Sequence, residues 1–179
     1  TDKATVTIRQ LLSHRSGLPA YRPYFIPLSN IEGCQRKKAL ERFLVREEMM
    51  GRPGAKRRYS DVGFLILQWI VERISGQRLD RFVERSIYGP LGLRDLFFPG
   101  LDGCRRRACA ATERCGLRQR VVEGEVHDEN AYIVGGVGGH AGLFGTAKAV
   151  WRLLVHLTNA YKNRTNQGGG RSGAVAQFF

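Results

Sequence analysis

Residues 53–76 read PGAKRRYSDVGFLILQWIVERISG. The long apolar run in this stretch predicts a buried helix, with Ser60 or Asp61 capping its start and Gly76 ending it. The triplet Tyr59-Ser60-Asp61 therefore stands at a helix N-terminus, where free backbone N–H groups and the positive end of the helix dipole lie. A tyrosine held at such a place can carry a proton or serve only for packing, and the surrounding sequence must distinguish the two roles.

Working outward from this helix, the pattern is mostly helix and loop. Further helices are expected at residues 8–13 (capped by Thr7), 35–50, 79–88 and 147–161, the last capped by Thr146 and buried through Val150, Trp151, Leu154 and Leu157. Short strands are expected near residues 119–122, and residues 131–145 are rich in glycine. No series of strands could build a full sheet, so we expect a partial domain over residues 1–161, belonging to a larger body, followed by a flexible polar tail over residues 162–179.

The composition is that of a globular domain with a basic surface. Of 179 residues, 42% are hydrophobic and 25% are charged, and the formal net charge is +13. Such a charge suits nucleic acid, a membrane surface or acidic ligands. The basic clusters are short and scattered, at residues 36–38, 56–58 and 105–107, so we expect a solvated basic surface and no nucleic-acid partner. No apolar run reaches membrane-spanning length, and neither localisation nor oligomeric state can be read from the sequence.

The four cysteines, Cys34, Cys104, Cys109 and Cys115, form no Cys-x-x-Cys pair. The last three could be combined with His127 into a zinc site, but their spacings match no standard zinc pattern. The sequence therefore favours free thiols, or a disulfide if the compartment is oxidising. We expect no cofactor and assign no metal ligand.

The loop at residues 135–142, GGVGGHAG, has three interpretations. It is not a phosphate loop, because no Gly-Lys-Ser/Thr follows it. Gly136, Gly138 and Ala141 fit the spacing of a dinucleotide fingerprint, but no acidic residue follows Glu129 to bind a ribose. We favour the third interpretation, a closely packed backbone segment that a ligand or strand can approach, with His140 exposed beside it.

The segment before this loop, His127-Asp128-Glu129-Asn130, gathers polar side chains. His127 and His140 could act as acid–base residues or as structural histidines with satisfied hydrogen bonds. A nucleophile is harder to find. Ser16 lacks the Gly-x-Ser-x-Gly context, no serine is followed three residues later by lysine, and there is no Lys-Thr-Gly. The chain alone carries only half of a catalytic site.

Several segments in collinear order between Thr5 and Leu157 resemble the β-lactamase-like serine hydrolases, which include class C β-lactamases, DD-peptidases and related esterases. They are TIRQLLSHRSGL at residues 7–18, PGAKRRYSDVG at 53–63, SGQ at 75–77, YGPLGL at 88–93, VHDENA at 126–131 and GHAGLF at 139–144. The resemblance implies an α+β fold of the β-lactamase/transpeptidase type, an antiparallel sheet flanked by helices together with a mostly helical domain. This chain would cover mainly that helical domain and part of the return to the sheet.

The resemblance also implies roles. Members of the family use the serine of a Ser-x-x-Lys motif as nucleophile, and a tyrosine that matches Tyr59 exchanges protons with it or with the leaving group. Asp61 occupies a position where the family has asparagine, and an ionised carboxylate accepts hydrogen bonds but cannot donate them. With Gly139 and His140 it forms the expected substrate-binding set.

A tyrosine with the ordinary pKa of about 10 needs a nearby cation to act as a base. The family's lysine would normally supply this charge, whereas Lys56, Arg57 and Arg58 are expected to face solvent. We therefore expect an internal fragment, inactive alone, of a hydrolase that cleaves an amide, ester or lactam in a small-molecule or peptide-like substrate. The alternatives are a non-catalytic binding or scaffold protein on the same fold and, less favoured, a basic nucleic-acid-binding module.

Overall fold

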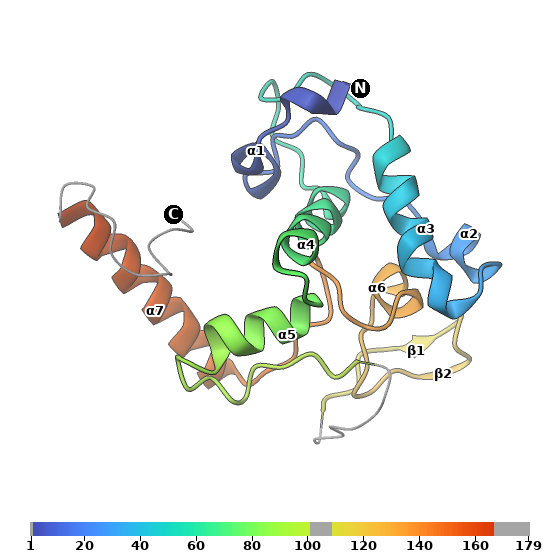
Figure 1. Cartoon of the computed structure of the whole chain (residues 1–179). Helices are drawn as coiled ribbons and strands as arrows, with labels where there is room; N and C mark the ends of the chain where they lie inside the picture. Colours follow the sequence, from blue (N-terminus) through green and yellow to red (C-terminus); the bar gives the residue numbers. More distant parts are fainter. Residues whose placement is uncertain (1, 101–108, 167–179) are drawn as a thin grey trace. The chain divides into compact units, whose positions relative to one another are not determined.

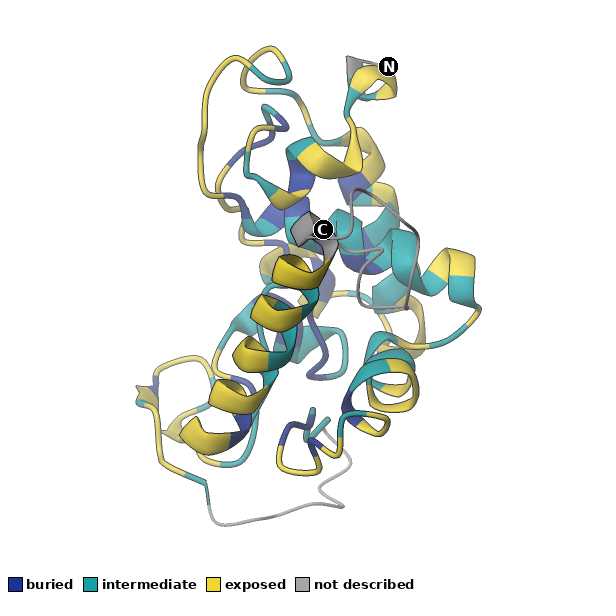
Figure 2. Cartoon of the chain, turned by 90° about the vertical axis from the view of Figure 1, so that its left-hand side faces the viewer, coloured by how far each residue is buried: buried dark blue, intermediate teal, exposed yellow. Residues whose placement is uncertain are grey.

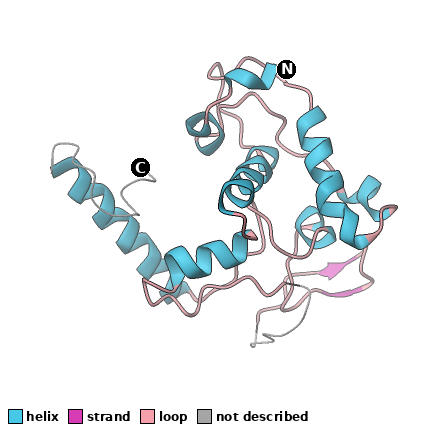
Figure 3. Cartoon of the chain, viewed as in Figure 1, coloured by secondary structure: helices cyan, strands magenta, loops and turns pink. Residues whose placement is uncertain are grey.

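The structure is a computed structural model that describes residues 2–100 and 109–166. The chain divides into two compact units. The first contains Thr1–Phe82 and Phe98–Leu143, and the second contains Val83–Phe97 and Phe144–Phe179. Each is described by itself below. Helices dominate both, and in the described part of the chain the named strands form one small two-stranded sheet (Figure 3).

Figure 1 traces these elements along the chain. The helical elements are η1 (Asp2–Thr5), α1 (Ile8–Leu12), α2 (Phe25–Ser29), α3 (Gly33–Arg46), α4 (Asp61–Ser75), α5 (Leu79–Val83), the π-helical turn η2 (Glu84–Tyr88), α6 (Glu129–Ile133) and α7 (Ala147–Asn166). Strands β1 (Arg114–Cys115) and β2 (Arg120–Val121) pair antiparallel, with Cys115 opposite Arg120. The helix expected at residues 79–88 is thus divided into α5 and η2, while α2, α6 and β1 were not expected.

The core of the first unit forms around α4, which packs against both α1 and α3 (Figure 1). Its buried residues are Leu11, Leu18, Tyr24, Leu28, Ala39, Leu40, Leu44, Val62 and Leu65. Each fully buried leucine or valine contributes ~1.5–3 kcal/mol, so this cluster fixes where α4 begins. The far end of α4 is less buried than its composition indicated, because Ile74 remains 80% exposed.

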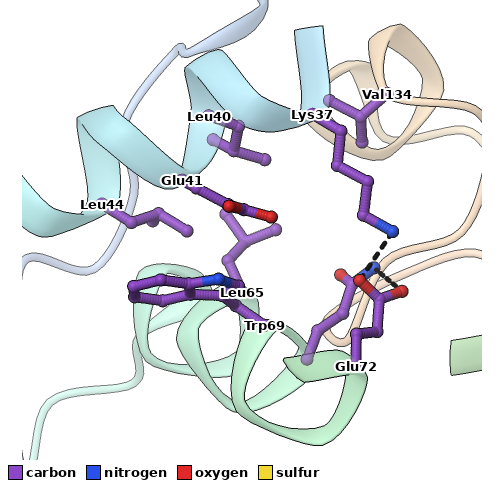
Figure 4. A pocket seen from close by; sticks show the side chains of 9 residues that line it. Lys37, Leu40, Glu41, Leu44, Leu65, Trp69, Glu72 and Val134 are labelled. Carbon is purple, nitrogen blue, oxygen red and sulfur yellow. Dashed lines mark hydrogen bonds and ion pairs between the residues drawn. The ribbon is translucent and has the colours of Figure 1, made fainter. Parts of the chain in front are cut away.

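The junction between α3, α4 and α5 is held by the Glu72 carboxylate. One oxygen lies 2.6 Å from the Lys37 ammonium of α3. The other accepts from the Leu79 backbone N–H at 2.9 Å, where α5 begins. Figure 4 shows this ion pair at the edge of a small pocket whose wall includes Trp69. The Lys37 ammonium and the Glu72 carboxylate are therefore paired with each other at this edge of the pocket.

The second unit buries Tyr88, Leu93, Leu96 and Ala149 around the start of α7. Thr146 caps α7 as predicted, accepting from the Ala149 N–H at 3.1 Å. Just before it, Phe144 forms an antiparallel bridge with Phe97. These contacts orient the first turns of α7.

The buried face of α7 differs from the expected one. Trp151 is 66% exposed, Leu154 is 52% exposed and Val150 is 43% exposed, and Figure 2 shows α7 with mostly exposed residues. The helix instead packs through Ala149 and Leu153. Apolar residues occur around most of the helix, so the sequence pattern did not reveal which face meets Tyr88 and Leu96.

The C-terminal boundary also shifts, because α7 continues to Asn166 and so includes the first five residues of the expected tail. The remainder of that tail, residues 167–179, lies outside the described residues. Among the helices of the described part, none combines the length and hydropathy needed to cross a membrane.

Candidate active site

Ser60 is the N-cap of α4 and holds the tyrosine triplet in place. Its Oγ accepts from the Gly63 N–H at 3.0 Å and donates to the Pro19 carbonyl at 2.7 Å. The side chain is only 1% exposed, so both polar functions of the hydroxyl are used inside the protein. The prediction that Ser60 or Asp61 caps this helix is confirmed for Ser60, and Tyr59 and Asp61 are left on either side of it.

Tyr59 lies at the surface beside His14. The phenol side chain is 66% exposed, and its ring centroid is 4.5 Å from that of His14. His14 also contacts Phe64 of α4, at 5.0 Å between ring centroids. One side of the tyrosine ring is therefore supported by the protein, while the rest of the side chain remains accessible.

His14 is a residue of this site to which the sequence reasoning gave no role. Its Nδ1 accepts the Ser60 N–H at 3.1 Å, so the hydrogen of the neutral ring is on Nε2. Its φ of 57° is in the left-handed region, where His, Asn and Asp are the non-glycine residues most often found. The signal that could have found it was its place in the segment LLSHRSGL, three residues before Gly17.

The loop that contains His14 and Ala20 is joined by backbone hydrogen bonds to the segment that contains the Tyr59-Ser60-Asp61 triplet. Arg58 donates to the His14 carbonyl at 2.8 Å, and Asp61 donates to the Ala20 carbonyl at 2.8 Å. At Gly17, where φ is 82°, a Cβ atom would stand 2.3 Å from the Gly51 carbonyl oxygen. Only glycine permits this approach. The side chains of residues 56–58 are exposed, as predicted.

A group of carboxylates surrounds Tyr21 near the start of α4. Burial raises the pKa of the Tyr21 phenol, and three negative charges raise it further. In order of size these are Glu129, Asp128 and Asp61. The predicted residue Asp61 therefore acts electrostatically on the same phenol as Asp128 and Glu129.

Gly139 packs directly against α4. A Cβ at this position would stand 2.4 Å from the Phe64 carbonyl oxygen and 3.0 Å from the Gln68 Cβ. Its backbone N–H donates to Oε1 of Gln68 at 2.9 Å, and Gln68 in turn donates to the Val137 carbonyl. The glycine-rich loop is thus a closely packed backbone segment, as the favoured interpretation held.

The expected exposure of His140 is wrong, because its side chain is only 3% exposed. Its Nε2 lies 2.9 Å from Oδ1 of Asp128, the N-cap of α6. Burial alone raises the pKa of Asp128, but the hydrogen bond and charge of His140 and the backbone N–H groups of α6 outweigh it, so this pKa lies below its usual value. Nδ1 of His140 is buried without a partner among the described residues. The sequence pattern contained no indication that Asp128 would hold this ring.

The structure provides no dinucleotide site at the glycine-rich loop. Such a fingerprint requires a strand leading into the glycines, whereas Tyr132 and Ile133 belong to helix α6. The neighbouring Asn130 is 1% exposed and joins α6 to the loop before α2, accepting from the Phe25 N–H at 2.9 Å and donating to the Arg22 carbonyl at 2.8 Å. In the polar segment at residues 127–130, Asp128 and Asn130 therefore use their side chains for hydrogen bonds within the protein.

This arrangement of helices matches that of penicillin-recognising and amidase folds. A penicillin binding protein from Bacillus halodurans superposes with a TM-score of 0.61 and 21% sequence identity, covering 88% of this chain and 49% of that one. D-amino acid amidase from Ochrobactrum anthropi SV3 gives a TM-score of 0.61 at 18% identity, covering 89% of this chain and 46% of the amidase. The fold is thus that of the β-lactamase and penicillin-binding-protein group, represented here mainly by its helical part.

The family model for Beta-lactamase matches residues 1–176, and the chain belongs to this family. It is similar to a putative D-alanyl-D-alanine carboxypeptidase of Escherichia coli K12, with 39% identity over 173 residues, 88% of this chain and 39% of that protein. It is also similar to an N-acetylmuramyl-L-alanine amidase of Bacillus subtilis 168, with 35% identity over 178 residues, 90% of this chain and 40% of the amidase. The chain therefore spans about two fifths of the length of these curated relatives.

Proposed function

We propose that this chain forms the tyrosine-bearing side of an acyl-transfer site in a hydrolase that cleaves amide bonds of peptide-like substrates. The observation that carries the proposal is the exposed Tyr59 phenol, which stands at the N-terminus of α4 and is supported on one side by His14. Membership of the Beta-lactamase family supports it. The similar proteins named as a carboxypeptidase and an amidase support an amide bond as the target.

In this proposal Tyr59 is the acid–base residue. The Tyr59 phenolate oxygen takes the proton from a serine hydroxyl, and the serine oxygen attacks the substrate carbonyl carbon at the same time. The phenol then returns the proton to the leaving nitrogen as the carbon–nitrogen bond breaks. The 179 residues contain no Ser-x-x-Lys, so the serine and the lysine that stabilises the phenolate come from polypeptide outside them.

Asp61, Gly139 and His140 are the proposed substrate-binding residues. An ionised Asp61 accepts hydrogen bonds only, so it suits an N–H or ammonium group of a substrate. Gly139 and His140 contribute less directly, because the Gly139 N–H is used by Gln68 and the His140 ring is held by Asp128. We assign Gly139 and His140 to the wall of the site, and Asp61 to direct contact with a ligand, because its carboxylate is not buried as the His140 ring is.

The test is a chimera in which this chain replaces the matching segment of the Escherichia coli relative. We expect the folded chimera to be acylated by a fluorescent penicillin or fluorophosphonate, and the chain alone to form no adduct. Tyr59→Phe should slow acylation by ~10²-fold or more, the usual size of general acid–base catalysis. Tyr161→Phe, which changes an exposed tyrosine of the second unit, is the matched control.

Two results would contradict the proposal. One is a folded chimera that never forms an adduct although the parent relative does. The other is equal acylation rates for the unaltered chimera and its Tyr59→Phe variant. Ligand binding without turnover, insensitive to Tyr59→Phe, would instead indicate the non-catalytic binding protein considered above.

A further inference from the structure

The β1–β2 hairpin and helix α6 bring three ligand-type side chains together in the first unit. The carboxylates of Glu113 and Glu129 and the thiol of Cys115 lie with their ligand atoms within 4.8 Å of one another. Glu113 immediately precedes β1 and Cys115 is the last residue of that strand, and the side chains of both approach the Glu129 carboxylate of α6. The imidazole of His127 is adjacent, with its Nε2 3.5 Å from Oε1 of Glu113.

Cys115 is the most unusual member of this group. It is only 2% exposed and its thiol is free. Its sulfur lies within 4.8 Å of carboxylate oxygens of Glu113 and Glu129. A buried free cysteine usually packs as a small apolar residue, whereas this thiol lies within 4.8 Å of two carboxylate oxygens, and that combination of ligand atoms is the setting of a metal site.

The nearby arginines do not neutralise the two carboxylates. Arg120 makes its ion pair with Glu125 at 2.7 Å. Arg118 lies over the Tyr132 ring, 4.0 Å from its centroid, and donates to the Val126 carbonyl at 2.8 Å. Within the described residues Glu129 has no ion-pair or hydrogen-bond partner for its carboxylate. Two carboxylates therefore lie beside Cys115, and neither is paired with Arg118 or Arg120.

We propose that Glu113, Cys115, Glu129 and His127 bind a zinc ion. Thiolate, imidazole and carboxylate are the ligand types that zinc uses in proteins. Four such side chains complete a tetrahedral coordination shell. Zinc–ligand bonds of ~2.0–2.3 Å require ligand atoms about 3.5 Å apart. The ligand atoms of Glu113, Cys115 and Glu129 lie within 4.8 Å of one another, so a bound ion would draw these three together, and His127, which lies beside Glu113, would move toward the ion to complete the shell.

This donor set explains why sequence spacing did not reveal the site. The ligands form the pairs Glu-x-Cys, at residues 113–115, and His-x-Glu, at residues 127–129. The cysteine pattern considered earlier relied on Cys104 and Cys109, which this site does not use. The ion would join the hairpin to the first turn of α6, whose cap Asp128 holds His140. Its role is structural, and it does not depend on acyl transfer at Tyr59.

The proposal is tested by titrating the reduced, chelator-treated chain with Zn²⁺ by calorimetry, and with Co²⁺ by absorption spectroscopy. We expect one ion per chain, a thiolate-to-cobalt charge-transfer band and a rise in melting temperature on Zn²⁺ addition. The band should vanish in Cys115→Ser and persist in Cys34→Ser, which changes an exposed cysteine. Glu113→Gln and Glu129→Gln should weaken binding about tenfold or more, and Glu123→Gln, at an exposed glutamate, should leave it unchanged.

Because Cys115 is buried, Cys115→Ser could unfold the hairpin, so the unaltered chain provides an independent criterion. A folded, reduced chain that takes up neither Zn²⁺ nor Co²⁺, or that binds Co²⁺ without the charge-transfer band, overturns the proposal. So does a folded Cys115→Ser variant that retains the band, since the thiolate ligand would then be another cysteine.

Discussion

The backbone N–H of Ser60 donates to Nδ1 of His14 across 3.1 Å, joining two residues 46 positions apart in the sequence. The same imidazole packs against the Tyr59 ring at 4.5 Å. One side chain therefore fixes both the backbone of the helix cap and the orientation of the tyrosine before it. The position of the proposed acid–base residue depends on a histidine from the loop after α1.

Replacing His14 should separate these two functions. His14→Ala leaves the Ser60 N–H without its acceptor and places alanine at φ 57°, so we expect a loss of ~2–4 kcal/mol in unfolding free energy. His14→Asn keeps an acceptor and a residue that tolerates this backbone conformation, so its loss should stay below ~1.5 kcal/mol. Urea denaturation measures both values. Equal losses for the two variants would show that the ring contacts, rather than the hydrogen bond, stabilise this corner.

Ser60 uses its hydroxyl both as acceptor and as donor. Ser60→Ala should therefore cost ~1–2 kcal/mol, the usual effect of losing an N-cap. Ser60→Asp, which often replaces serine well at a cap, should not rescue stability here, because a carboxylate would face the Pro19 carbonyl oxygen. Thermal unfolding followed by circular dichroism distinguishes these cases. An aspartate variant as stable as the native chain would contradict the importance of the Pro19 bond.

Gly139 is required by the close approach of its loop to α4. Gly139→Ala forces a methyl group against the Phe64 carbonyl oxygen, and we expect a destabilisation of ~1–3 kcal/mol, as for other overpacked sites. Gly116→Ala is the matched control, because a Cβ there meets nothing within 4 Å. Chemical denaturation of both variants checks the difference. A destabilisation of the same size at Gly116 would show that the effect is not specific to the contact with α4.

The fold should weaken at alkaline pH through Tyr24. Burial, then the hydrogen bond to Glu47 at 2.5 Å and its charge, raises the pKa of the Tyr24 phenol well above its usual value, although Arg22 acts in the opposite direction. A raised pKa in the folded state means that the stabilisation is complete below pH 10 and is lost at higher pH, as the unfolded chain ionises first. The limiting loss is ~1.4 kcal/mol per pH unit.

The measurement compares unfolding free energies at pH 8.5 and at ~pH 11, an interval that brackets the ordinary tyrosine pKa. The loss on raising the pH should be smaller in Tyr24→Phe than in the native chain. An identical pH dependence in the native chain and in Tyr24→Phe would exclude Tyr24 as the cause.

Local signals in the sequence were sufficient to predict the helices whose capping residues also mark the ends of the buried, packed segment. Helix α4 occurs at its predicted residues because Ser60 and Gly76 define its two ends. Thr7 caps α1 as predicted, through a capping box with Gln10. The family resemblance was confirmed as well. For the two helices the information lies in the residues at their own ends, and for the family it lies in short segments that occur in a fixed order along the chain.

The features that could not be predicted depend on distant partners. Helix α6 begins at Glu129, after the N-cap Asp128, and the same Asp128 carboxylate holds the ring of His140 from the glycine-rich loop. His140 appeared exposed because it lies in a glycine-rich loop, yet its ring is buried by that long-range contact. The role of His14 likewise required knowledge of where Ser60 would lie. The functions of Tyr59, Asp61, Gly139 and His140 remain predictions that the proposed variants will test.

The chain contains two tryptophans, and each compact unit has one. Trp69 is partly buried on α4 in the first unit, whereas Trp151 is 66% exposed on α7 in the second. Intrinsic fluorescence therefore offers a separate optical reporter for each unit. With Trp151→Phe the emission follows the first unit alone, and with Trp69→Phe it follows the second, so the two unfolding transitions can be recorded without any attached label.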